Sequence, residues 1–137
     1  LDYLELGNLE IERDWGYAPE YCEGMWMILQ QKIPEDFVLA TGKTNSVREF
    51  VELTFNELDI EIYWEGNKDK EVGKDSKSGK TLIKIDPAYY RPTEVDILIG
   101  DPKKANNELG WKPTTTINEL VKIMVKSDYE KIKSRGY

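Results

Sequence analysis

Two short segments carry arginines in settings that suit anion binding. Arg13 lies in the sequence Arg-Asp-Trp-Gly, between a predicted strand and a predicted helix, where a side chain can project into a cleft. Arg91 lies between Pro87 and Pro92, which restrain the backbone on either side of it. A planar guanidinium forms paired hydrogen bonds with phosphate oxygens, and a restrained arginine loses less conformational entropy in doing so. Both segments are therefore candidates for phosphate recognition.

Each candidate also has a simpler explanation. Arg13 and Asp14 can equally form an exposed ion pair, which contributes little to stability. Glu94 follows Arg91 by three residues and can accept hydrogen bonds from a sugar diol. The same spacing suits an ion pair between Arg91 and Glu94 within an ordinary turn. The residue types alone leave both interpretations open.

Composition excludes several kinds of catalytic and metal site. The 137 residues include no histidine, so this chain holds no Ser-His-Asp triad, no Cys–His pair and no histidine zinc site. Cys22 is the only cysteine, which excludes an internal disulfide and a cysteine zinc cluster. We expect no metal site, and we expect Cys22 to be an inert thiol in the core.

The charge balance narrows the range of partners. The chain has 19 Lys and Arg against 26 Asp and Glu, a net charge of -7. No broad basic surface is available for nucleic acid or an anionic membrane, so a phosphate ligand must be held by a few local cations. The length and the 33% of charged residues are typical of one soluble domain, or one domain and part of another. Because no signal peptide or membrane-length apolar run is present, we expect a cytoplasmic protein.

Hydrophobic periodicity predicts helices mixed with short strands that would position these residues. Helices are predicted over residues 19–31, 46–58 and 101–110, and from about Thr116 onward. Strands are predicted at residues 4–6, 9–11, 36–41, 60–64, 81–85 and 95–99, with a solvent-exposed loop or hairpin at 65–80. No glycine-rich phosphate loop follows a strand, so the sequence predicts no dinucleotide-binding half in this chain.

Two helical segments allow finer predictions. The first helix carries an apolar stripe that we expect to be its buried face, formed by Tyr21, Cys22, Met25, Trp26 and Leu29. The polar tail over residues 126–137 is expected to fray. Within it, Tyr129 and Lys133 match Tyr-x-x-x-Lys, the catalytic pair of short-chain dehydrogenases. We reject that assignment, because no cofactor fold precedes the pattern and a lysine-rich helix produces it by chance.

Four segments together resemble the GDP-mannose 4,6-dehydratase family. They are residues 6–18 (LGNLEIERDWGYA), 21–31 (YCEGMWMILQQ), 40–51 (ATGKTNSVREFV) and 86–100 (DPAYYRPTEVDILIG). Residues 100–113 match the closing pattern of extended short-chain dehydrogenases in general. Tyr17 and Asn45 depart from the family pattern, which usually has histidine at both places.

The resemblance implies an α/β fold over residues 1–137. In that fold the chain is the C-terminal substrate-binding region of an extended short-chain dehydrogenase, a fragment that lacks the N-terminal Rossmann core. The complete enzyme would use NADP to move a hydride from C4 of the mannose to C6, with loss of water across C5–C6. Its product would be GDP-4-keto-6-deoxy-mannose. The missing half would bind most of the NADP and supply the catalytic residues, so this chain alone should be inactive.

The resemblance also assigns site residues. Arg13 and Arg91 would hold the diphosphate of GDP-mannose, Glu94 the ribose hydroxyls, and Val47 would border the guanine pocket. The complete enzyme is expected to be a homo-oligomer. Two alternatives remain open: a related nucleotide-sugar epimerase or dehydratase with another base or sugar, and a non-catalytic nucleotide-sugar-binding protein.

Overall fold

Two helices begin where the sequence provides a reciprocal cap. The computed structural model describes residues 2–90 and 95–136. Ser46 and Glu49 form a capping box at the start of α2 (Val47–Asn56), as predicted. Thr116 and Glu119 form a second box at the start of α3 (Ile117–Arg135). The prediction that residues 126–137 fray is wrong for the described part of that tail, because α3 continues through it to Arg135.

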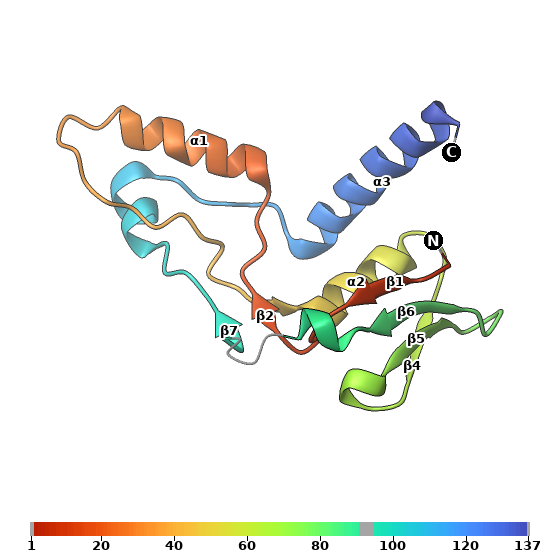
Figure 1. Ribbon diagram of the computed structural model, residues 1–137. Coiled ribbons are helices and arrows are strands. Elements are labelled where there is room, and N and C mark those ends of the chain that lie inside the picture. Colours follow the sequence, from red (N-terminus) through yellow and green to blue (C-terminus); the bar gives the residue numbers. More distant parts are fainter. Residues whose placement is uncertain (1, 91–94, 137) are drawn as a thin grey trace.

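A four-stranded sheet forms one end of the molecule (Figure 1). Its order is β1 (Leu4–Leu6), β6 (Thr81–Ile85), β5 (Val72–Asp75) and β4 (Ile62–Glu65). β1 runs parallel to β6, whereas β4, β5 and β6 are antiparallel neighbours. The polar segment 65–80 thus forms the β4–β5 hairpin, with a 3-10 turn at Lys68–Lys70, and the tight turn into β6.

A second, small sheet joins three distant parts of the chain. β2 (Glu12–Arg13) lies in its centre, antiparallel to β3 (Asn45–Ser46) and parallel to β7 (Ile97–Leu98). The strand predicted at residues 9–11 therefore lies slightly later in the chain, and the one predicted at 95–99 is shorter. This sheet connects α1 and its neighbours to the four-stranded sheet (Figure 1).

The strand predicted over residues 36–41 is not formed. A strand needs a hydrogen-bonded neighbour, and this segment pairs with no strand among the described residues. It instead packs closely on the end of β7, where a Cβ on Gly100 would lie 2.3 Å from the Cβ of Ala40. Beyond Gly100, a short helical turn at Ala105–Leu109 ends at Gly110 with a φ of 71°, the helix end that the sequence predicts.

The apolar stripe of α1 (Ala18–Leu29) is mostly exposed, contrary to the prediction. Met25, Trp26 and Leu29 are 57%, 60% and 80% exposed, and Cys22 is exposed as well. The helix buries its glycine face instead, because Gly24 packs against Leu39 and Trp111 and leaves no room for a side chain. The buried apolar residues are Leu9, Ile11, Ala40, Val51, Ile83, Ile85, Ala105, Trp111, Leu120 and Val121.

Candidate functional site

Arg13 lies in the centre of the small sheet, where three segments meet. Its Nη1 donates hydrogen bonds to the carbonyl oxygens of Glu12, at 2.7 Å, and Val95, at 2.9 Å. The second contact joins residues 82 positions apart. The backbone of β2 is fixed on both sides, by β3 and β7. The fold therefore holds the Arg13 guanidinium beside the chain that emerges from residues 91–94.

Arg91 and Glu94, the other two candidates, lie outside the described residues. The described chain stops at Tyr90 and resumes at Val95, the residue that accepts a hydrogen bond from Arg13. Tyr90 follows the 3-10 turn Pro87–Tyr89, which is fixed by a hydrogen bond from the Ala88 amide to the Asp86 carboxylate. The diphosphate role of Arg91 and the diol role of Glu94 remain predictions.

Asp14 acts as a clamp, a role that the sequence analysis missed. Its Oδ1 accepts hydrogen bonds from the amide and hydroxyl of Thr41, at 2.9 and 2.6 Å, and its Oδ2 accepts one from the Gly42 amide at 2.9 Å. Both carboxylate oxygens thus fasten the end of β2 to a turn 27 residues further along. The sequence signal for this contact was an aspartate together with a glycine-containing turn, but the two are so far apart in the chain that the sequence did not show them to be neighbours.

Val47, the candidate beside the base, is the first residue of α2. Its amide donates to the carbonyl of Ile11 at 3.1 Å, so the start of α2 is joined to the segment that becomes β2. Asn45 faces Arg13 across the β2–β3 pair. The structure therefore brings Arg13 and Val47 into one neighbourhood, while contact of Val47 with a base remains a prediction.

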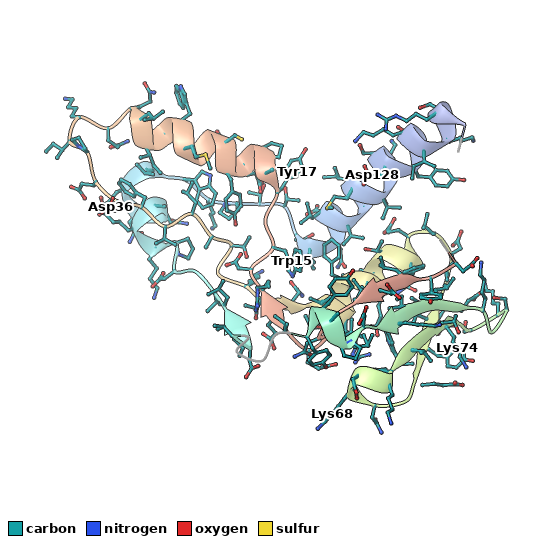
Figure 2. All side chains as sticks on the ribbon, in the orientation of Figure 1. Trp15, Tyr17, Asp36, Lys68, Lys74 and Asp128 are labelled. Carbon is teal, nitrogen blue, oxygen red and sulfur yellow. The ribbon has the colours of Figure 1, made fainter. Side chains whose placement is uncertain are left out.

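Trp15 fills the space next to Asn45. Its ring stacks on Phe50 of α2 with centroids 4.7 Å apart, and its Nε1 donates to the Asn45 carbonyl at 3.2 Å. Trp15 also lines a pocket of about 220 Å³ between residues 41–45 and 113–117. Figure 2 shows Trp15 and Tyr17 on the segment that leads from β2 to α1. Asn45, a departure from the family pattern, thus lies at this pocket as well as beside Arg13.

Glu20 and Tyr21 form the polar side of the α1 start. Burial raises the pKa of Glu20, but hydrogen bonds from Thr114 and Thr115 outweigh it, so the pKa lies below its usual value. Burial, followed by the carboxylates of Asp14 and Glu20, raises the pKa of Tyr21. The Tyr21 ring packs directly on Gly16, which has no room for a side chain. Tyr21 therefore stays a neutral phenol at neutral pH and serves packing.

The described residues do not fit a dinucleotide cofactor. Such a group needs a glycine-rich turn from a strand into an open helix N-terminus. The N-termini of α2 and α3 are closed by capping boxes, and the turn from β2 into α1 has a single glycine, Gly16, against which the Tyr21 ring packs. Over residues 2–90 and 95–136 there is also no cluster of acidic or cysteine side chains able to hold a metal ion. In the same residues, no helix is long and apolar enough to cross a membrane.

Solved structures define the class to which this fold belongs. The chain is similar to RMD from Pseudomonas aeruginosa in complex with NADPH, at a TM-score of 0.70 and 20% identity, covering 95% of this chain and 36% of that one. It is similar to dTDP-glucose 4,6-dehydratase from Bacillus anthracis in complex with NAD, at a TM-score of 0.72 and 16% identity, covering 96% and 36%. The chain thus has an α/β fold, as the sequence predicts, and shares it with about a third of each of these two proteins.

Sequence relatives then identify the family. The model of the family described as GDP-mannose 4,6 dehydratase matches residues 1–124. The GDP-mannose 4,6 dehydratase of Dictyostelium discoideum is 56% identical over 133 residues, covering 97% of this chain and 37% of the relative. That of Homo sapiens is 49% identical over 134 residues, covering 98% and 36%. The chain belongs to the GDP-mannose 4,6 dehydratase family and spans little more than a third of the length of these relatives.

Proposed function

We propose that this chain is the GDP-mannose-binding region of a GDP-mannose 4,6-dehydratase, with Arg13 as a diphosphate ligand. The observation that carries the proposal is the placement of Arg13 at the junction of β2 and β7, where its guanidinium donates to the carbonyl of Val95, a residue that follows Arg91 by four positions in the sequence. A guanidinium that is already oriented by two carbonyl oxygens meets an anion with little loss of conformational entropy. Local cations of this kind allow a protein with a net charge of -7 to bind a diphosphate.

The complete activity belongs, in this proposal, to a polypeptide of the length of the relatives. That protein would convert GDP-mannose to GDP-4-keto-6-deoxy-mannose in the cytoplasm, as a homo-oligomer, with NADP as the hydride carrier. In this proposal the region described here binds the substrate, while the remainder of the polypeptide binds most of the NADP and carries out the hydride transfer. The same division accounts for our expectation that the chain alone is inactive.

The proposal also explains the exposed apolar stripe of α1. Met25, Trp26 and Leu29 are too exposed for an amphipathic helix whose packing is complete. In the relatives, about two-thirds of the chain lies outside the part that matches this sequence. We propose that this remainder, which would carry the NADP site, packs on α1 and on the exposed β7.

The test compares arginine variants of the complete polypeptide. Arg13→Ala should weaken GDP-mannose binding by roughly tenfold to a hundredfold, the loss expected for one charge-assisted pair. Arg91→Ala should have a similar effect, and neither variant should change NADP affinity. Arg135→Ala is the matched control, since Arg135 is an exposed arginine in the last turn of α3. Unchanged affinity for GDP-mannose in Arg13→Ala would remove this residue from the site.

A further inference from the structure

Arg48 stands in an unfavourable place for a cation. It is the second residue of α2, where the positive end of the helix dipole repels positive charge. The structure compensates with two carboxylates and one ring. The Arg48 guanidinium donates to Glu10, with Nε at 2.8 Å from Oε1, and to Glu71, with Nη2 at 2.8 Å from Oε2. Its Cζ lies 4.6 Å from the centroid of the Trp64 ring.

Burial ranks these two ion pairs. The side chains of Arg48 and Glu71 are 22% and 14% exposed, whereas Glu10 is 69% exposed. Water therefore screens the pair with Glu10 more strongly than the pair with Glu71. Burial lowers the pKa of Arg48, yet the hydrogen bonds that it donates to Glu71 and Glu10 outweigh the effect of burial, so the pKa lies above its usual value. Glu71 is thus the main anchor of Arg48, and Arg48 in turn holds Glu10.

Arg48 is tied to the segment that leads to Arg13. Its own amide donates to the carbonyl of Leu9 at 3.0 Å, and the preceding amide donates to that of Ile11 at 3.1 Å. Leu9 and Ile11 are buried core residues, so this segment cannot shift without disturbing the core. The amides of Val47 and Arg48 therefore fix the backbone of this segment, and the Arg48 side chain adds a contact at Glu10, three residues before Arg13.

The same cluster reaches the other candidate segment. Arg48 and Glu71 line a pocket of about 210 Å³ together with Tyr90, the last described residue before Arg91. Nearby, the carbonyl of Tyr89 lies against Gly7, where a Cβ would be only 2.5 Å away. One ionic cluster thus borders the chain leading to each of the two candidate arginines.

We propose that Arg48 is a positioning residue for the diphosphate site: its pairs with Glu71 and Glu10 set the place of the Leu9–Arg13 segment, and so of the Arg13 guanidinium. The inference rests on the proposed function. Lysine cannot replace Arg48, because a single ammonium does not reach both carboxylates in the fork geometry or stack flat on Trp64. Glu71→Gln should act like Arg48→Ala, and Glu10→Gln should act in the same direction, because Glu10 is the residue of the Leu9–Arg13 segment that the Arg48 side chain contacts.

The experiment measures the ratio of GDP affinity to guanosine affinity by calorimetry in the complete polypeptide. Only GDP carries the diphosphate, so the ratio reports on Arg13 and its position. In Arg48→Ala the ratio should fall about tenfold, equivalent to about 1.4 kcal/mol, while guanosine affinity stays unchanged. In an Arg13→Ala background the added Arg48→Ala should lower GDP affinity no further. Lys74→Ala is the matched control, because it removes a different ion pair, the one between Lys74 and Glu65 in the β4–β5 hairpin. Figure 2 shows Lys74 well away from Trp15.

The outcomes separate the two proposals. If Arg13→Ala binds GDP as wild type does, the proposed diphosphate role of Arg13 fails, and with it any role of Arg48 that acts through it. If Arg13→Ala loses affinity but Arg48→Ala keeps the ratio, the positioning role alone is overturned. An equal loss from Arg48→Ala with and without Arg13 overturns it too. Should Arg48→Ala not fold, Glu71→Gln, which keeps the shape of the side chain, provides the same comparison.

Discussion

Replacing Asp14 with asparagine removes the clamp between β2 and the turn at residues 41–42. The change keeps the shape of the side chain, so any effect comes from charge and hydrogen-bonding capacity. The carboxylate accepts three hydrogen bonds, two at Oδ1 from Thr41 and one at Oδ2 from the Gly42 amide. In asparagine, one oxygen remains for Thr41, and an amide group that can only donate faces the Gly42 N–H.

The magnitude follows from those contacts. A hydrogen bond to a charged group contributes about 1.5–3 kcal/mol and a neutral one about 0.5–1.5 kcal/mol. Asp14→Asn loses the bond from Gly42 and weakens both bonds from Thr41. Gly42 is exposed, so water partly replaces the lost acceptor. We expect a loss of about 2 kcal/mol in the free energy of unfolding, toward the lower end of that range.

The assay is urea denaturation of the complete polypeptide, with Asp101→Asn as the matched control. Asp101 is an exposed carboxylate that accepts local hydrogen bonds from the amide and the ammonium of Lys103. The control should unfold at nearly the same urea concentration as wild type, because an exposed ion pair contributes little to stability. If Asp14→Asn unfolds at the same urea concentration as wild type or the control, the clamp does not stabilise the fold.

Three further changes have defined outcomes. Glu20→Gln should destabilise the protein at pH 7, because folding lowers the pKa of Glu20 and its ionised carboxylate therefore stabilises the folded state at pH values above 4.5. Thermal unfolding at a series of pH values measures this effect, and the difference from wild type should vanish as the pH falls through the lowered pKa. Thr116→Ala should cost about 1 kcal/mol in urea denaturation, since it removes the cap of α3. Tyr129→Phe should leave turnover of the complete enzyme unchanged, because Tyr129 is 58% exposed on α3; a large loss of turnover would show that the Tyr-x-x-x-Lys match is functional.

Local sequence signals were sufficient to predict where α2 and α3 begin. Ser46 and Glu49 are three residues apart, and the capping box that this spacing predicts depends on no distant part of the chain. Gly110 ends a helical turn for an equally local reason, its positive φ. The strand at Thr81–Ile85 also formed as predicted, because its apolar residues have partners on both sides within the chain.

Features that depend on distant neighbours could not be predicted in this way. Residues 36–41 have strand-like composition, but composition provides no pairing partner, and the segment stays unpaired. The apolar stripe that includes Met25 and Trp26 was expected to be the buried face of α1, but both side chains are exposed. The face that is buried contains Gly24, which packs against Leu39 and Trp111. The sequence singled out Arg13 by its type and setting, but its contact with Val95, 82 residues away, required the fold.

The most direct test of the proposed GDP-mannose site is a calorimetric titration of the complete polypeptide with GDP-mannose and, separately, with UDP-glucose. Both ligands carry a diphosphate, and they differ in the base and in the C2 configuration of the hexose, so the comparison measures selection of the whole nucleotide sugar. Our account predicts saturable binding of GDP-mannose, at least about tenfold tighter than UDP-glucose, a difference of 1.4 kcal/mol or more. Equal affinity for the two ligands, or no binding of GDP-mannose by a folded protein, would contradict it.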